Sequence, residues 1–254
     1  MKKEKLYLST VDENAGDLSR KYGLGLELAE FCTAWNLDDE FPQTDEKIRK
    51  ESQGIDRFTI HGPYNELFPC AIDRRARALA RDRFCQTLEI ARHYGVHKVV
   101  FHAGFNPWLY YPIWFTEQSI VFFKDFVREI PEDITVCLEN VLEDTPAMMT
   151  DIIRAVDSPR LRMCLDVGHA NAYSKVKPET WITECRDVLD HFHIHNNDGT
   201  RDSHSALTEG TIPMADLLAQ IECLCPRATL TLELPDGAAS LDWMSKNHLL
   251  EEEK

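Results

Sequence analysis

Short apolar runs recur along the chain, and between them lie longer stretches with an apolar residue at every third or fourth position. The short runs predict eight strands, at 5–10, 23–31, 56–62, 97–104, 134–141, 161–169, 190–196 and 228–236. The longer stretches predict helices, among them 73–94, 116–130, 145–157, 178–188 and 213–222. Such alternation of strands and helices is typical of an α/β fold with a parallel sheet.

Eight strand and helix units in 254 residues have the size of a (β/α)8 TIM barrel, whose active sites lie at the carboxyl ends of the strands. A doubly wound open sheet is the alternative. It is less favoured because the first connection, STVDENAG at 9–16, lacks the glycine-rich fingerprint of a dinucleotide site. No stretch rich in Pro, Gly or Ser divides the chain, so we expect one barrel domain over 1–254.

Composition narrows the class of protein. A formal net charge of −15 argues against non-specific binding of nucleic acid by the whole surface, although a local basic strip is still compatible with it. No apolar run approaches the roughly 18 residues of a membrane span, and 1–10 resembles a first strand rather than an export signal. Eight cysteines without paired spacing then favour free thiols in the cytoplasm. The acidic tail, 251–254, is expected to be a frayed helix end.

The segment from Asp190 to Gly210 concentrates potential metal ligands and proton carriers in a stretch too polar for a core element. They are His193, His195, Asp198, Asp202, His204 and Glu209. Because side chains alternate along a strand, the motif HFHIH places His191, His193 and His195 on one face. We expect His195, by its position, to reach the strand end and point into a site. Turn residues follow it, so Asp202 and His204 are expected on the next loop.

From the third strand onward, each predicted strand ends on a His or a carboxylate. These residues are His61, His102, Glu139, Asp166 with His169, His195, and Glu233. Each one alone is more often solvated or satisfied in the core. Six in succession would meet at one barrel rim, where they repel or desolvate one another unless a cation lies among them. The pattern therefore predicts a divalent metal centre, with Cys137 and Cys164 as small buried fillers inside the barrel.

The motifs IHGPY, VVFHAG, CLENV, CLDVGHAN, HIHNNDG with RDSH and EG, and LELPD resemble, in order, the sequence blocks of the xylose isomerase-like TIM barrels. This superfamily includes sugar and sugar phosphate isomerases and epimerases, and also endonuclease IV. The resemblance covers nearly the whole chain. It implies the barrel fold and a divalent metal, and the two branches imply different reactions.

The epimerase branch implies one ion, commonly Mn, Mg, Co or Zn, held by Glu139, Asp166, His195 and Glu233. Glu139 and Glu233 would then remove and return a proton through an enediolate, because a chelated ketose has a more acidic C–H bond. His169 would assist catalysis and, with Arg201, contact substrate oxygens. No predicted strand ends on Lys, which disfavours a lysine-assisted hydride shift.

The endonuclease IV branch implies three zinc ions and cleavage of a phosphoester at an abasic site. Its nine ligand positions are all filled here, by His61, His102, Glu139, Asp166, His169, His195, Asp202, His204 and Glu233. The segments ENVLEDTP and HNNDGTRDSH depart from the blocks of that branch, which makes nucleic acid the less expected partner.

Residues outside the ligand set suggest how substrate is held. The loop NPWLYYPIWF at 106–115, which includes Trp108, could form a lid over a sugar, stack on bases or pack on neighbouring helices. Tyr64 follows His61 closely enough to overhang the site, and with His61, His102, Trp108 and Arg201 it completes the expected substrate contacts. The Arg74, Arg77 and Arg81 face is expected to be solvated, with a phosphate contact as the alternative.

Our leading hypothesis is a cytoplasmic, metal-dependent isomerase or epimerase of a small sugar or sugar phosphate, with a homo-oligomer possible. The alternatives are a zinc phosphoesterase and a metal-binding protein without catalysis. The sequence does not fix the phase of the second strand, so it leaves Glu27 and Glu30 ambiguous.

Overall fold

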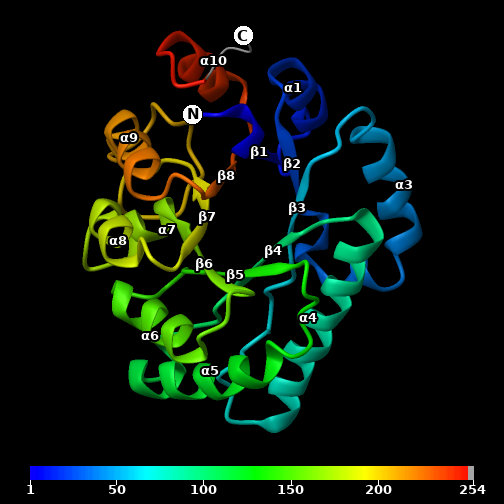
Figure 1. Cartoon of the computed structure of the whole chain (residues 1–254), viewed down its shortest axis with the longest axis vertical. Helices are drawn as coiled ribbons and strands as arrows, with labels where there is room; N and C mark the ends of the chain where they lie inside the picture. Colours follow the sequence, from blue (N-terminus) through cyan, green and yellow to red (C-terminus); the bar gives the residue numbers. More distant parts are fainter. Residues whose placement is uncertain (251–254) are drawn as a thin grey trace.

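The computed structural model describes residues 1–250 and contains a closed barrel of eight parallel strands in chain order (Figure 1). The strands are β1 (Leu6–Ser9), β2 (Gly25–Leu28), β3 (Phe58–His61), β4 (Lys98–His102), β5 (Thr135–Glu139), β6 (Leu161–Asp166), β7 (Leu189–Ile194) and β8 (Thr229–Leu232). All eight predicted strands are present, and the prediction of a (β/α)8 barrel is confirmed. The tail at 251–254, expected to be a frayed helix end, lies outside the described residues.

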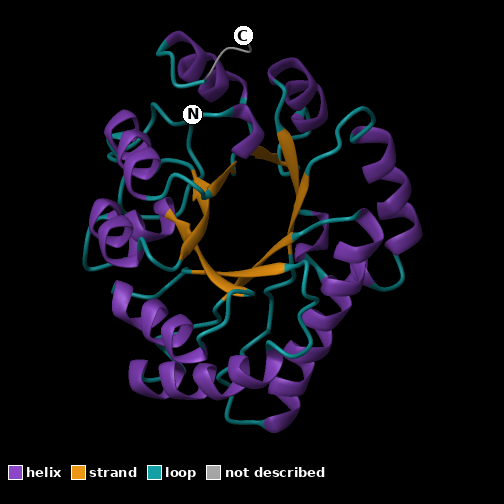
Figure 2. Ribbon diagram, viewed as in Figure 1, coloured by secondary structure: helices purple, strands orange, loops and turns teal. Residues whose placement is uncertain are grey.

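Helices surround the barrel (Figure 2). They are α1 (Ala15–Tyr22), α2 (Ala34–Leu37), α3 (Phe41–Glu51), α4 (Arg74–Tyr94), α5 (Pro112–Phe126), α6 (Pro146–Val156), α7 (Val167–Tyr173), α8 (Pro178–Cys185), α9 (Met214–Leu224) and α10 (Ala238–Lys246), with short 3-10 turns η1 (Lys3–Lys5) and η2 (Glu30–Cys32). The core lies between helices and strands, where Phe84 of α4 stacks on Phe101 of β4 with ring centroids 4.0 Å apart.

The sixth strand is shorter than predicted. It ends at Asp166, and α7 begins at the next residue, so His169 lies in the first turn of a helix and not on a strand. The Asp166 carboxylate accepts a hydrogen bond from the backbone N–H of His169 at 2.6 Å, which caps this helix. Two predicted site residues are thus joined by a capping contact that apolar periodicity does not reveal.

Inside the barrel, Lys98 binds Asp190 at 2.8 Å near the amino ends of the strands. Val100, Cys137 and Cys164 form a small buried cluster of their own. Cys137 and Cys164 are therefore buried fillers, as predicted. The cysteines carry free thiols. Within residues 1–250 no helix combines the length and apolar character that crossing a membrane requires.

Candidate metal centre

Four side chains converge at the carboxyl ends of the last four strands. They are Glu139 of β5, Asp166 of β6, His193 of β7 and Glu233, which follows β8, and each offers a ligand atom within 4.8 Å of the others. Glu139, Asp166 and His193 are buried to within 1% of full burial. Three carboxylates so close together in the interior are a strongly destabilising arrangement unless positive charge lies among them.

The third and fourth strands add two imidazoles to the same rim. The Nε2 atom of His61 lies 3.1 Å from Glu139 Oε2, and that of His102 lies 3.5 Å from the same oxygen. Tyr64 stacks on His102 with ring centroids 4.3 Å apart and an interplanar angle of 11°. It also meets His61 edge to face at 5.7 Å, so it overhangs the rim as expected.

A second group of donors lies beside the first and consists of His169, Asp202 and His204. Asp202 Oδ2 lies 3.1 Å from His169 Nε2 and 2.9 Å from His204 Nε2. His204 has a φ of 45°, a left-handed conformation that is uncommon for a residue other than glycine. Its backbone is therefore held in a strained position, as is common near functional sites.

His195 lies between the two groups. Its Nε2 atom is 3.1 Å from both oxygens of Asp166, and its ring stacks on His204 with centroids 3.9 Å apart. A Cβ atom added at Gly168 would lie 1.9 Å from His195 Cε1, so only glycine permits this approach of α7 to β7. The structure thus brings together all nine predicted metal ligands.

Sequence reasoning missed the central part that His193 and Glu27 play. His193 belongs to the ligand-rich segment, yet we expected only His195 to point into the site. Its Nδ1 atom lies 3.3 Å from Glu139 Oε1 and 3.3 Å from Glu233 Oε2, and its Nε2 atom lies 2.9 Å from Glu27 Oε1. Glu27 is fully buried. A lone carboxylate inside an otherwise apolar strand, LGLELA, was the available signal.

Glu27 is fixed from below by hydrogen bonds to its other oxygen. Thr59, Thr231 and His191 reach Glu27 Oε2 at 2.9, 3.1 and 3.1 Å. His191 also lies 2.6 Å from the hydroxyl oxygen of Thr229. HFHIH therefore directs all three histidines to the inside, as its period predicts, and each occupies a different depth.

The pH dependence of stability tests the buried hydrogen bonds between His191 and Glu27. Burial lowers its pKa to about 4, while an unfolded histidine titrates near 6.5. The unfolded chain therefore binds more protons between these values, and stability falls as pH decreases. We expect His191 to contribute a loss of about 1.4 kcal/mol in the free energy of unfolding between pH 7.5 and 5.5.

The measurement is urea unfolding at both pH values for the wild type and His191→Gln, an amide that can still bond to Glu27. The variant should lack about 1.4 kcal/mol of the wild-type pH dependence. The control, His97→Gln, removes an exposed histidine and should show the same pH dependence of stability as the wild type. An unchanged dependence in His191→Gln would contradict the assignment.

The rim carboxylates are paired with histidine side chains. Across residues 1–250, every ion-pair partner of Glu139, Asp166 and Glu233 is a histidine. Burial alone would raise the pKa of Glu139, but the facing His193 and His102 hold it well below its usual value. Burial lowers the pKa of His102 to about 4, so its ring is neutral near pH 7 and retains a lone pair for a cation.

The donor set fits a divalent cation. Four buried atoms at the rim have no hydrogen-bond partner among the described residues: Glu139 Oε1, His193 Nδ1, His195 Nδ1 and Asp202 Oδ1. Buried polar atoms are normally paired, so such a cluster is what a site for a bound cation would present. Imidazole and carboxylate donors suit Zn, Mn and Co.

Other predicted site residues are exposed to solvent. Trp108 is 82% exposed and Arg201 is also exposed, so neither is packed on the buried donors in this conformation. Asp198 and Glu209 are exposed as well, which removes two of the six candidates in the ligand-rich segment. Asp198 instead accepts hydrogen bonds from Thr200 in a tight turn.

Glu143 is a further carboxyl that sequence reasoning overlooked. It is 1% exposed, and burial raises its pKa to about 7. One oxygen accepts a hydrogen bond from the Val141 backbone N–H at 2.6 Å, and the other has no partner within the described chain. A carboxyl with such a pKa near Glu139 and His169 has the properties of a proton carrier.

Comparison with known proteins places the chain among barrels of one kind. A family model described as xylose isomerase-like TIM barrel matches residues 21–248. An uncharacterised protein of Methanocaldococcus jannaschii is 28% identical over 179 residues, or 64% of this chain and 59% of the relative. A probable endonuclease 4 of Ureaplasma parvum is 23% identical over 191 residues, which are 67% of this chain and 62% of the relative. The chain spans about three fifths of the length of the curated relatives that it matches.

Solved structures share the fold. A D-tagatose 3-epimerase-like protein superimposes with a TM-score of 0.79 at 20% identity, over 96% of this chain and 97% of the other. A Thermus thermophilus protein soaked with ZnCl2 superimposes with a TM-score of 0.77 at 23% identity, over 95% of this chain and 97% of the other. A Clostridium cellulolyticum D-psicose 3-epimerase with D-tagatose superimposes with a TM-score of 0.69 at 15% identity, over 89% of this chain and 83% of the other. At these identities the likeness shows the barrel.

Proposed function

The chain belongs to the xylose isomerase-like TIM barrel family, and on that premise we propose that it is a divalent-metal-dependent isomerase or epimerase of a small sugar or sugar phosphate. One observation carries the proposal. The carboxylates of Glu139, at the end of β5, and Glu233, just after β8, both lie 3.3 Å from the same atom, His193 Nδ1. They therefore border one space, which suits removal of a proton on one side of a substrate carbon and its return on the other.

Glu139, Asp166, His195 and Glu233 would hold the ion. When bound, it would lower the pKa of the C–H bond next to a ketose carbonyl and stabilise the enediolate charge. The chain itself supplies the proton carriers and their positions. Glu27 and His193 hold the two glutamates from below, and the capping contact with Asp166 fixes His169.

Substrate contacts in this proposal come from the rim above the carboxylates. His61, His102 and Tyr64 form one wall, in which the Tyr64 ring covers His102. His169 faces the space from α7. Trp108 and Arg201 would reach the sugar only by movement of their loops, because both side chains are exposed to solvent. We place this enzyme in the cytoplasm, a location that the free thiols support.

The test is exchange of solvent deuterium into a panel of ketoses and ketose phosphates, followed by proton NMR, with Mn or Co present. We expect loss of signal at one carbon of one sugar series, and no exchange after chelation. Absence of exchange in every sugar with either metal would overturn the proposal.

A zinc phosphoesterase is the second candidate, and a specific observation favours it. The His169, Asp202 and His204 group is a second set of three donors beside the central carboxylates, which a single-ion epimerase does not need. The likeness to a probable endonuclease 4 agrees with it.

Metal content separates the two candidates. Elemental analysis of the purified protein should give about one ion per chain for the epimerase and about three for the phosphoesterase. A duplex with one abasic site supplies the second measurement. Nicking of this duplex together with three ions would replace our leading proposal.

A further inference from the structure

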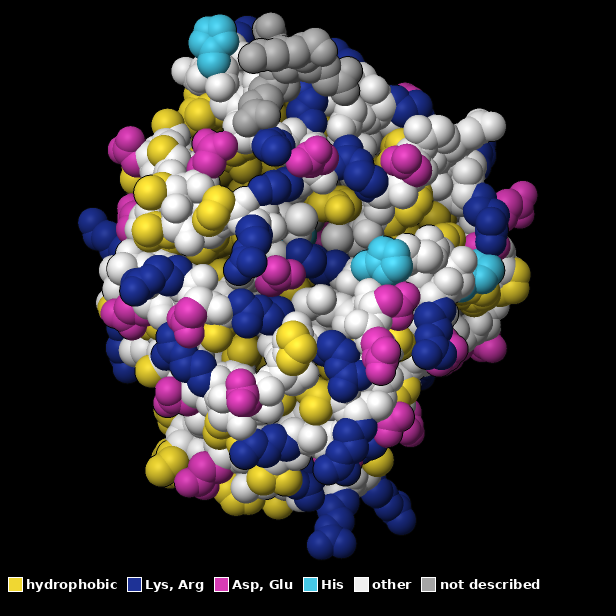
Figure 3. All heavy atoms as spheres, viewed as in Figure 1, with side chains coloured by type: hydrophobic (Ala, Val, Ile, Leu, Met, Phe, Trp, Pro, Cys, Tyr) yellow, Lys and Arg dark blue, Asp and Glu magenta, His cyan; other side chains and the backbone are white. Residues whose placement is uncertain are grey.

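A cavity of about 590 Å³ opens at the amino-terminal end of the barrel, opposite the candidate metal centre. Its wall includes the beginnings of β6 and β7 and the segment between α9 and β8, and it presents Arg162, Arg186 and Arg227. Figure 3, which looks down the barrel, shows many Lys and Arg side chains around the centre of one end. Such a concentration is unexpected in a chain with a net charge of −15.

The acidic residues in this cavity are already neutralised. Asp187 pairs with Arg154 at 2.7 Å, and Asp190 pairs with Lys98 at 2.8 Å. Among the described residues, Arg162 and Arg186 donate only to backbone carbonyl oxygens, those of Asp187 at 2.6 Å and Thr183 at 2.8 Å. In the chain up to residue 250, none of the three cavity arginines has a carboxylate at ion-pair distance.

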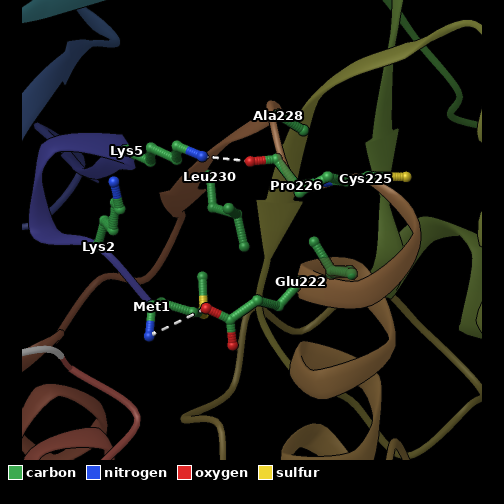
Figure 4. A pocket seen from close by; sticks show the side chains of 9 residues that line it. Met1, Lys2, Lys5, Glu222, Cys225, Pro226, Ala228 and Leu230 are labelled. Atoms are coloured by element: carbon green, nitrogen blue, oxygen red, sulfur yellow. Dashed lines mark hydrogen bonds and ion pairs between the residues drawn. The ribbon is translucent and has the colours of Figure 1, made fainter.

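A smaller cavity of about 190 Å³ adjoins this one and shares Cys225, Pro226 and Ala228 with it (Figure 4). Lys2 and Lys5 line it, and Lys5 donates to the backbone carbonyl of Pro226. Its other walls combine apolar side chains, among them Leu230, with Glu222, which lies 3.6 Å from the Met1 amino group. The two cavities together offer a cationic chamber next to a smaller one lined by both apolar and charged groups.

We propose that this end of the barrel binds a small phosphorylated molecule, with the phosphate on Arg162, Arg186 and Arg227. Guanidinium groups bind phosphate oxygens through paired, charge-assisted hydrogen bonds, and those of this cavity have donors to spare. The volume lies within the range of ligand pockets. The adjoining cavity would receive the organic part of the ligand. This site stands independently of the reaction proposed for the metal centre.

The experiment is calorimetric titration of the metal-loaded protein with pyrophosphate and with fructose 6-phosphate. The test variant is Arg186→Gln with Arg227→Gln, two exposed positions whose change should not affect folding. The control is Arg92→Gln with Arg128→Gln, which makes the same change in charge at two exposed arginines outside the cavity. We expect the test variant to bind at least about tenfold more weakly and the control to bind as the wild type does.

Tighter binding of fructose 6-phosphate than of pyrophosphate would assign the smaller cavity to the organic part, and the reverse order would assign the site to a bare phosphate. Equal binding by wild type and test variant, as expected for phosphate held at the metal centre, would overturn the proposal. Equal weakening in both double variants would also overturn it, because the effect would then come from net charge. A stronger loss of affinity for a 20-base-pair DNA duplex than for either phosphate would identify the surface as a nucleic-acid face instead.

Discussion

Replacing Glu139 with Gln is expected to reduce turnover of the ketose substrate by about a thousandfold, the size of effect that a lost general base produces. The amide keeps the shape and volume of the side chain but cannot accept the proton. Three other proposed donors, Asp166, His195 and Glu233, remain, so the variant should retain part of its metal. The measurement combines turnover with metal content for the same preparation.

Glu209→Gln is the matched control, because it makes the same chemical change in the ligand-rich segment at a side chain that is exposed. It should retain activity within about twofold of the wild type. Deuterium exchange separates two causes of a loss in Glu139→Gln. A variant that keeps its metal yet exchanges the substrate proton at the wild-type rate would show that Glu139 does not carry the proton.

Much of the candidate metal centre could be predicted, because the barrel fixes where each position along a strand lies in space. Parallel strands end on the same rim, so a His or carboxylate at the end of each strand must lie near the next. His61, His102 and Glu139 follow this rule, and each is a strand's last residue in the structure. The loop residues Asp202 and His204 were placed by the turn chemistry that precedes them, together with the family resemblance.

Other features depend on contacts that no local pattern records. β2 is buried on both faces, so alternation could not show that Glu27 points inward. His193 and His195 are two residues apart and share one face of the strand. Alternation alone cannot show which of them lies beneath the rim, because this depends on how deep the strand sits in the barrel. The orientation of Trp108 and Arg201 is a property of loops, which carry no periodic constraint.

The buried rim carboxylates should make the metal-free protein less stable than the metal-bound form. The second large effect that we expect is therefore on stability. Glu139, Asp166 and Glu233 meet in a buried space, and their ion-pair partners among residues 1–250 are all histidines. An ion that binds the folded chain, but not the unfolded one, adds stability in proportion to the logarithm of its free concentration over its dissociation constant. At about a thousandfold excess this is about 4 kcal/mol.

Chelation should therefore lower the melting temperature by about 8–16 °C, since 1 kcal/mol corresponds to about 2–4 °C in a domain of this size. Calorimetry with EDTA, and then with excess Mn or Zn, provides the measurement, and the added ion should restore the transition. Asp166→Asn is the control, because it removes a shared donor while its amide oxygen can still cap α7. That variant keeps three of the four proposed donors, so EDTA should lower its melting temperature by less than it lowers that of the wild type. A wild-type transition indifferent to chelation would mean that the histidines alone stabilise the cluster, and the rim would then be an ion-pair network of the protein itself rather than a metal site.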